Sequence, residues 1–382
     1  MKTLHIALVT ETYPPEINGV AMTVGRLVSG MRERGHRVDI VRPRQLGESS
    51  TVGSTGHDLT VRGLPLPGYA GLRLGLPAGR SLLARWKASR PDLVHVATEG
   101  PLGWSAVSAA RRLGIPATSG FHTNFDSYSS HYGAGWLKPA VSAYLRSFHR
   151  RTQATLVPTE SLAAALAREG IPGVKVVGRG VDTELFDPAR RCDGLRRDWL
   201  GEAPGASLAC LYVGRLAPEK NLALVEQAFA AIQARRPDAR MVWVGDGPAR
   251  SRLALAHSDH VFAGARIGED LAKHYASADL FLFPSLTETY GNVVPEAMAS
   301  GLAVVSYRAA AAAELIVDGE NGRSVAPGDA SAFLKAAEDM ALAPRPQALA
   351  HRARITALTR NWATVVERFE TVLGEAILTG RR

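Results

Sequence analysis

Short, mainly apolar runs alternate with longer amphipathic segments along the first half of the chain. Residues 6–9 and 38–41 have the length of strands, and residues 20–34 between them have helical spacing and end at Gly35. Further strands are predicted at residues 93–96, 117–120, 156–158 and 174–177. This alternation is typical of a parallel sheet covered by helices. Residues 45–79 are rich in Gly, Pro and Ser, and we expect irregular structure there.

The pattern breaks around residues 178–188 and then restarts, and the two halves join near residues 183–205. Strands are predicted at residues 208–213, 241–244, 261–263, 280–283 and 303–305, with a helix at 221–235. We therefore expect an α/β protein with two Rossmann-like parallel-sheet domains, residues 1–182 and 183–361. Residues 362–382 form a C-terminal helix in this prediction, because apolar side chains recur there at helical spacing. They are Val365, Val366, Phe369, Leu373 and Ile377.

Length and composition agree with two soluble domains. The chain has 382 residues, of which 46% are hydrophobic, enough for two buried cores. Its apolar runs are too short to span a bilayer, and it starts directly with a strand pattern instead of a signal segment. Cys192 and Cys210 are the two cysteines of the sequence. This number implies no disulfide framework, and we expect a cytoplasmic protein.

The net charge of +9 is concentrated in the first half of the chain. Residues 1–180 contain 22 Lys and Arg against 11 Asp and Glu, whereas residues 181–382 contain 23 against 25. A basic half suggests an anionic surface or substrate: phospholipid, nucleic acid or an acidic acceptor. Residues 136–151 and 80–87 combine apolar and basic positions, which suits a helix on an anionic membrane. More often such segments are core helices with solvated basic flanks, and both interpretations stay open.

The most informative stretch is residues 287–301. It follows the apolar run 280–284, and a glycine loop leads to Pro295 at the expected start of a helix. Free backbone N–H groups at a helix start bind phosphate, and a carboxylate accepts hydrogen bonds from paired sugar hydroxyls. Glu288 and Glu296 lie eight positions apart around this point, which suggests a nucleotide sugar. The alternative is that Glu296 only complements the helix start and Glu288 is a solvated loop charge.

A second loop supplies cations. Gly214 allows close approach of the backbone to a ligand, and Arg215 and Lys220 lie beside the start of the predicted helix 221–235. Arg binds phosphate with two parallel hydrogen bonds and Lys acts as a point charge, so a diphosphate fits this loop. An ion pair of Glu219 with a neighbour is the competing interpretation.

These strings together resemble glycosyltransferase family 4, the retaining enzymes of the GT-B fold. Residues 287–301 resemble its E-x7-E signature, and residues 214–220 resemble its G-R-x-x-x-E-K motif. The resemblance implies two Rossmann-like domains facing a cleft, with the C-terminal helix crossing back to the first domain. Across nearly its whole length the chain resembles members that glycosylate lipids, including mannosyl and diacylglycerol-type transferases.

The resemblance also implies roles for individual residues. Glu288 faces the transferred sugar, Glu296 holds the ribose, and Arg215 and Lys220 bind the diphosphate. The Asn292 and Val293 backbone joins the diphosphate site, Gly19 approaches the phosphates, and Asn18 replaces the first glycine of a glycine pair. His122 belongs to an H-T segment that contacts the transferred sugar, and Arg266 contacts the donor. Asp126 and Tyr128 are acceptor candidates.

The expected reaction is hexosyl transfer from a nucleoside-diphosphate sugar to an acceptor hydroxyl. We expect no cofactor and no metal, because the sequence contains no Asp-x-Asp cluster and two cations can neutralise the diphosphate. The expected partners are the nucleotide sugar, a lipid or glycan acceptor and an anionic membrane surface, with no nucleic acid. Two alternatives remain. An epimerase of the same two-domain form needs no acceptor, and a basic peripheral binding module needs no catalytic loops.

Overall fold

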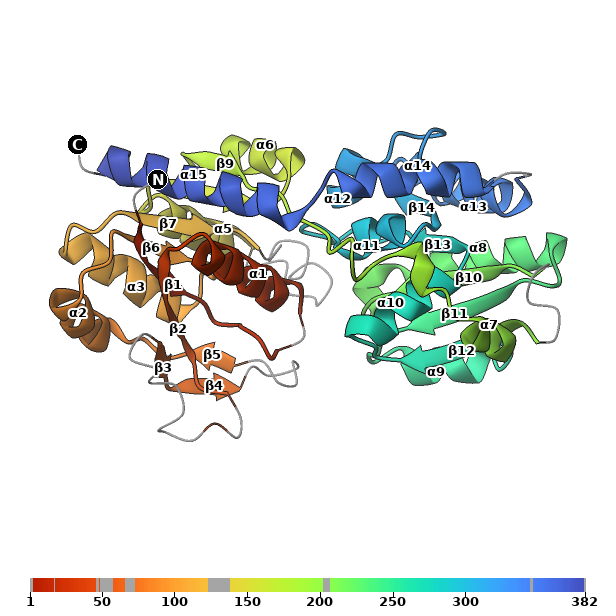
Figure 1. The fold of residues 1–382 in the computed structure, drawn as a ribbon, viewed down its shortest axis with the longest axis horizontal. Coiled ribbons are helices and arrows are strands. Elements are labelled where there is room, and N and C mark those ends of the chain that lie inside the picture. The colour runs from red at the N-terminus through yellow and green to blue at the C-terminus, as the bar shows by residue number, and fades with distance from the viewer. Residues whose placement is uncertain are drawn as a thin grey trace. The chain divides into compact units, whose positions relative to one another are not determined.

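The computed structural model describes residues 3–16, 18–45, 48, 58–65, 73–122, 138–201, 207–343 and 346–380. The chain divides into two compact units, each with its own sheet (Figure 1). Unit 1 comprises Met1–Ser129, Ala134–Arg179 and Trp362–Arg382. Unit 2 comprises Ser130–Gly133 and Gly180–Asn361. The chain therefore returns to unit 1 for its last segment.

Unit 1 contains a seven-stranded sheet in the order β3-β2-β1-β6-β7-β8-β9. All its neighbouring strands pair in parallel. The strands are β1 (His5–Val9), β2 (Arg37–Pro43), β3 (Leu59–Val61), β6 (Leu93–Val96), β7 (Ala117–Gly120), β8 (Ala154–Val157) and β9 (Val174–Val176). The strand order reverses between β1 and β6. In open α/β sheets, ligands bind outside the carboxyl ends of the strands at such a reversal.

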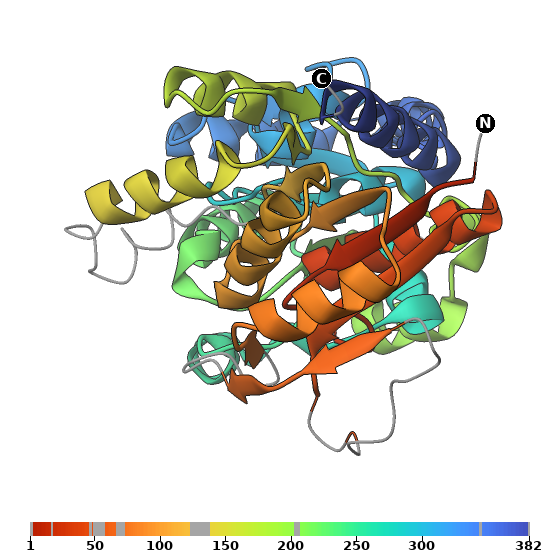
Figure 2. The same cartoon turned by 90° about the vertical axis from the view of Figure 1, so that its left-hand side faces the viewer.

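Helices cover both faces of this sheet because alternate residues of β1 point in opposite directions. Ile6 and Leu8 pack with α1 (Gly19–Glu33) and α15 (Trp362–Gly380). Ala7 and Val9 pack with α2 (Gly79–Ala88) and α3 (Pro101–Arg112), which lie side by side (Figure 2). Unit 1 also contains α5 (Lys138–His149) and α6 (Glu160–Arg168).

Helix α15 is held on unit 1 by packing and by charge. Val366 lies against Gly30 of α1, where an added Cβ would come within 2.4 Å of Val366 Cγ2. Glu370 is buried and accepts a hydrogen bond from Arg34 Nε at 2.6 Å. His36 Nε2 lies 3.0 Å from the other oxygen of Glu370. The expected crossing of the C-terminal helix back to the first domain is confirmed.

The prediction of irregular structure over residues 45–79 is wrong in part. Strand β3 joins the edge of the main sheet, where Leu59 pairs with Val41. Strands β4 (Gly63–Pro65) and β5 (Arg73–Gly75) form an antiparallel pair. Each strand has three residues, too few to show a periodic pattern. Tertiary pairing, and not local sequence, makes them strands.

Unit 2 contains a six-stranded sheet in the order β12-β11-β10-β13-β14-β15, again parallel throughout. The strands are β10 (Ala209–Val213), β11 (Arg240–Val244), β12 (Val261–Gly264), β13 (Leu280–Phe283), β14 (Ala303–Tyr307) and β15 (Arg323–Val325). The helices are α7 (Asp193–Leu200), α8 (Leu222–Arg235), α9 (Arg250–Ala256), α10 (Gly268–Ser277), α11 (Val293–Ala299), α12 (Ala310–Leu315), α13 (Ala330–Leu342) and α14 (Pro346–Leu358). Two Rossmann-like α/β domains were expected, and this is confirmed. The order of this sheet reverses between β10 and β13.

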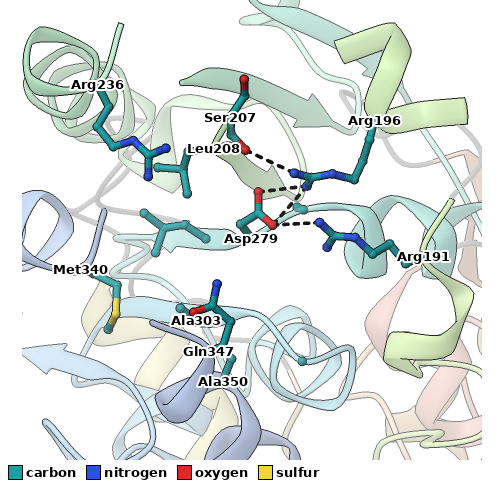
Figure 3. Close-up of a pocket in the computed structure, with 13 residues that line it drawn as sticks. Arg191, Arg196, Ser207, Leu208, Arg236, Asp279, Ala303, Met340, Gln347 and Ala350 are labelled. Atoms are coloured by element: carbon teal, nitrogen blue, oxygen red, sulfur yellow. Dashed lines mark hydrogen bonds and ion pairs between the residues drawn. The ribbon is translucent and has the colours of Figure 1, made fainter. Parts of the chain in front are cut away.

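The predicted junction at residues 183–205 contains helix α7, which belongs to unit 2. The Arg196 side chain of this helix is buried and donates to Asp279 Oδ2 at 2.9 Å and to the Ser277 carbonyl at 2.8 Å. Figure 3 shows Arg196 and Arg191 pointing towards Asp279. They line a pocket of about 330 Å³ at the amino ends of β10, β13 and β14. The ion pairs therefore fasten α7 to the edge of the sheet opposite the glycine loops.

None of the helices in the described ranges combines the length and apolarity that crossing a lipid bilayer requires.

Candidate active site

Two loops of unit 2 meet where the strand order reverses. One follows β10 and starts at Gly214, and the other follows β13. Asn221 Nδ2 donates to the Pro284 carbonyl at 3.3 Å, and Thr287 Oγ1 donates to the Glu219 carbonyl at 3.1 Å. Asn221 has a left-handed backbone with φ of 56°, a conformation that Asn tolerates better than most residues. The two loops are therefore fastened together outside the carboxyl ends of β10 and β13.

Lys220 and Glu288 form an ion pair between these loops. Both side chains are mostly buried, and Ser285 Oγ donates to the same Glu288 oxygen at 2.8 Å. Gly291 leaves space beside Glu288, because an added Cβ would lie 3.3 Å from Glu288 Cγ, and its φ of 81° also favours glycine. The sequence predicted both charges at the site but not their direct contact. A polyanion bound here would therefore contact the Lys220 side chain, which Glu288 already orients.

Arg215 lies beside the buried carboxylate of Glu219, with 3.7 Å between Nη1 and Oε1. Tyr212, which is buried in the core, donates from its hydroxyl to the Arg215 carbonyl at 3.3 Å. The ion pair of Glu219 that the sequence offered as an alternative is thus present. It also orients Arg215 in the loop after β10, so the two interpretations are compatible.

Glu296 lies on α11 and accepts a hydrogen bond from Tyr275 Oη at 3.0 Å. Burial raises the pKa of Glu296 to about 7, and the Tyr275 hydrogen bond opposes this shift. Burial, together with the Glu296 carboxylate, raises the pKa of Tyr275 well above its ordinary value. Glu296 therefore has a buried partner in Tyr275 in addition to its place near the helix start. Near neutral pH Glu296 exists in both protonation states. Glu288, which the alternative took as a solvated loop charge, is mostly buried and paired with Lys220.

The predicted start of the helix at Pro295 is wrong. Helix α11 begins at Val293, and the preceding residue, Asn292, already has helical backbone angles. Pro295 is the third helical residue, a position where its missing N–H costs no intrahelical hydrogen bond. Glu296 N is the first amide after it and donates to the Asn292 carbonyl at 3.1 Å. Asn292 and Val293 thus form the start of the helix, beside the Glu288 loop.

Arg266 follows β12 at the same edge of the sheet, but its side chain is hydrogen-bonded to residues of its own segment. Its Nε donates to the Ala263 carbonyl at 2.8 Å, and Nη1 donates to Asp270 at 2.9 Å. Strand β11 lies between β12 and β10. The donor contact of Arg266 stays a prediction.

The residues predicted from the first half lie in unit 1. Gly19 is the first residue of α1, and the side chain of Asn18 accepts from Val20 N at 3.1 Å and Ala21 N at 2.9 Å. Asn18 therefore caps the helix with its side chain, which a glycine lacks. The amides of Val20 and Ala21 are occupied by this cap.

His122 follows β7, and its Nδ1 lies 3.5 Å from Arg179 Nη2. Burial and the nearby guanidinium of Arg179 hold the pKa of His122 well below its ordinary value. Asp126 and Tyr128 lie outside the described residues, and their predicted acceptor contacts stay predictions.

Three site residues were not assigned roles from the sequence: Tyr275, Ser285 and Arg179. Tyr275 lies 21 positions before its partner Glu296, and no local pattern connects them. Ser285 lies three residues before Glu288, so its place in the loop after β13 was a usable signal. Arg179 was part of a break in the pattern, without a motif to identify it.

Comparison with known proteins agrees with this geometry. The model for Glycosyltransferase Family 4 matches residues 17–185, and the model for Glycosyl transferases group 1 matches residues 207–342. A GDP-mannose-dependent alpha-mannosyltransferase of Mycobacterium tuberculosis is 34% identical over 95% of this chain and 94% of that protein. A sulfoquinovosyl transferase of Arabidopsis thaliana is 30% identical over 85% of this chain and 63% of that protein.

Solved structures share the fold at lower identity. HepE of Anabaena in complex with UDP superposes with a TM-score of 0.74 at 19% identity, over 97% of this chain and all of that one. A sucrose-phosphate synthase of Thermosynechococcus elongatus gives a TM-score of 0.74 at 18% identity, over 98% of this chain and all of that one. With a relative at 34% identity over nearly its whole length, the protein is a glycosyltransferase and belongs to glycosyltransferase family 4.

Proposed function

We propose that the protein transfers a hexosyl group from a nucleoside-diphosphate sugar to an acceptor hydroxyl, with retention at the anomeric carbon. The observation that carries this proposal is the gathering of Lys220, Glu288 and Arg215 outside β10 and β13, with Glu296 on the adjacent helix α11. The mannosyltransferase relatives are named as GDP-mannose-dependent, and structures that share the fold were solved with UDP or UDP-glucose. GDP-mannose and a UDP-hexose are therefore the first donors to test.

In this proposal the diphosphate lies between the two cations. Lys220 gives up part of its contact with Glu288 to the phosphate oxygens, and Arg215 adds its guanidinium from the loop after β10. Stabilising the departing diphosphate lowers the barrier because negative charge develops there as the glycosidic bond breaks. Glu288, released in part from Lys220, accepts hydrogen bonds from hydroxyls of the transferred sugar. Glu296 accepts hydrogen bonds from the hydroxyls of the ribose.

The route to retention is front-face attack, in which the donor phosphate takes the proton of the acceptor hydroxyl. The protein then contributes position and charge, without a covalent intermediate on a side chain. We also propose that no metal or other cofactor takes part, because Lys220 and Arg215 neutralise the diphosphate. Transfer measured with and without a chelator tests this part. Unchanged rates are expected, and a complete, reversible loss on chelation would contradict it.

Replacing Lys220 with Ala tests the donor site. We expect product formation to fall by about 10²–10³-fold, the loss seen when one charge-stabilising donor is removed from an active site. Lys273→Ala is the matched control, since Lys273 is exposed on α10 of the same unit. Thermal melting of both variants reports the fold, and NMR of the product gives the anomeric configuration. Undiminished transfer by a folded Lys220→Ala variant, or an inverted product, would contradict the proposal.

We propose a membrane lipid or lipid-linked glycan as the acceptor. One relative, 27% identical over 80% of this chain, is an alpha-monoglucosyldiacylglycerol synthase of Streptococcus pneumoniae. In unit 1 the apolar side chains of α2, Leu82 and Trp86, are buried, whereas Arg80 and Lys87 are exposed. Contact with an anionic membrane would therefore be electrostatic and peripheral, without insertion of this helix.

Vesicle flotation tests the membrane contact. Binding to vesicles with anionic lipid is expected to weaken as salt rises, because exposed charges are screened. The double variant Arg80→Glu/Lys87→Glu should bind less, and vesicles of neutral lipid alone should not bind. Equal binding to neutral and anionic vesicles would remove this part of the proposal, while transfer to a soluble acceptor would still test the enzyme.

A further inference from the structure

The ring of His122 is placed by two features of unit 1. It folds back over the end of β7, where an added Cβ on Gly120 would come within 2.6 Å of His122 Nε2. The absence of a side chain at Gly120 therefore makes space for the ring. On the other side of the ring, Nδ1 lies 3.5 Å from Nη2 of Arg179.

Arg179 follows β9 and is buried, with 6% of its surface exposed. Its guanidinium carries only donors, and it keeps its proton at any pH that a folded protein survives. Nδ1 of His122 must then act as the acceptor in this contact. In the neutral ring the single proton lies on Nε2 as a consequence.

We propose that Arg179 is a positioning residue that holds His122 neutral with its ring proton on Nε2, so that His122 serves as a hydrogen-bond donor to a hydroxyl of the transferred sugar. The part about the sugar rests on the proposed function. The part about the ring rests on unit 1 alone. His122 is thus a neutral donor, and neither a general base through Nδ1 nor a cation.

The other titratable neighbour supports the same assignment. His95 on β6 lies close enough to act electrostatically on His122, and its Nδ1 is 2.9 Å from Thr118 Oγ1. Burial lowers the pKa of His95 to about 3, so His95 is neutral near pH 7. Burial is the largest cause of the low pKa of His122, followed by Arg179 and then His95. Arg179 is therefore a permanent charge that adds to the effect of burial in keeping a second proton off the ring.

Ring NMR of selectively ¹⁵N-labelled protein tests the tautomer without any substrate. In the wild-type protein we expect His122 to carry its proton on Nε2 and to show no titration between pH 6 and 9. In Arg179→Gln, the pKa of His122 should move upward because a positive neighbour is lost. In Arg179→Lys it should stay low because the charge remains. A wild-type ring protonated on Nδ1, or an unchanged titration in Arg179→Gln, would overturn the inference.

Steady-state kinetics of Arg179 variants tests whether the placement of the His122 ring affects catalysis. The kcat of Arg179→Gln should fall about 10²-fold, the scale of a misplaced catalytic contact, with a smaller change in donor KM and a new acidic limb in the pH profile. Arg179→Lys should recover most of the loss without the new limb. A purely structural role of Arg179 would lower the melting temperature but leave the shape of the pH profile unchanged, and this result would also overturn the inference.

A further variant covers the case in which Arg179→Gln does not fold. Gly120→Ala keeps Arg179 but forces the ring away from β7, and it should likewise raise the pKa of His122. If it does not, the placement of the ring by Arg179 is refuted. A wild-type protein that shows the expected tautomer but transfers no sugar from any donor would refute the proposed function and leave the assignment of Arg179 standing.

Discussion

Glu296 illustrates how one carboxyl group can couple donor binding to pH. Its pKa of about 7 results from burial. The ionised form is the stronger hydrogen-bond acceptor for the hydroxyls of a ribose, because its negative charge is shared by both oxygens. Tyr275 donates to one oxygen at 3.0 Å and fixes the orientation of the group. The orientation of the Glu296 carboxyl group therefore depends on an aromatic residue 21 positions earlier in the chain.

Donor affinity should rise with pH because binding favours the ionised form of Glu296. Between pH 6 and 8 the ionised fraction of a group with a pKa near 7 rises about tenfold, and affinity should rise by the same factor at most. Calorimetry with an intact nucleotide sugar measures this, since a free terminal phosphate would itself titrate in this range. Glu296→Gln should bind more weakly and show a flat profile. A flat wild-type profile would contradict the raised pKa.

At the scale of whole elements, the packing of helix α15 on helix α1 also depends on close contact. Seven apolar side chains of α15 are buried, and Gly30 allows the two helices to approach. Polar contacts add to this packing, because buried Glu370 forms an ion pair with Arg34 and lies 3.0 Å from His36 Nε2. The C-terminal helix is thus part of the core of unit 1, although it follows unit 2 in the sequence.

Gly30→Ala should destabilise the protein by about 1–3 kcal/mol, because the new methyl group overpacks against Val366. Gly374→Ala on α15 is the matched control. A Cβ there meets no atom within 4 Å, so the substitution should stabilise the helix by about 0.5–1 kcal/mol. Chemical unfolding measures both. If Gly30→Ala proved as stable as Gly374→Ala, α15 would not pack against α1 as described.

Asp279→Ala should cost about 3–5 kcal/mol, because it leaves the buried guanidinium of Arg196 without its carboxylate. Asp238→Ala is the control, since Asp238 pairs with Arg236 at the surface and its side chain is 41% exposed. A surface pair contributes about 0–1 kcal/mol. Comparable losses for the two variants would mean that Arg196 finds other partners and that α7 does not depend on this ion pair.

The last segment of the chain completes unit 1, although the rest of that unit lies in the first half of the sequence. Residues 362–382 supply apolar cover for a sheet that begins at His5. Each unit also has its own strand reversal with candidate site loops beside it, between β1 and β6 and between β10 and β13. Unit 1 cannot be described by a single continuous stretch of the chain, because its last segment follows unit 2 in the sequence.

Deletion of residues 362–382 should expose the apolar face of unit 1. We expect loss of soluble protein, or a product that binds hydrophobic dyes, because a large apolar patch loses its cover. A deletion of residues 379–382 alone is the control, since the buried residues of α15 end at Ile377. A folded, dye-negative protein after the longer deletion would contradict this account.

The sequence by itself determined most of the strands and helices, the two α/β domains and the existence of the C-terminal helix, because these depend on periodic patterns of apolar residues over many positions. The return of that helix to the first domain was implied only by the resemblance to the family. The sequence also identified Lys220, Glu288, Arg215 and Glu296 as candidates, because each lies in a loop between a strand and a helix or in the first turn of that helix. Only the tertiary structure decided the pairing of Lys220 with Glu288, the contact of Tyr275 with Glu296 and that of Arg179 with His122. These contacts join residues 21 to 68 positions apart. No local pattern encodes them, since side-chain distance, burial and the resulting pKa values exist only once the sheet has brought its carboxyl ends together.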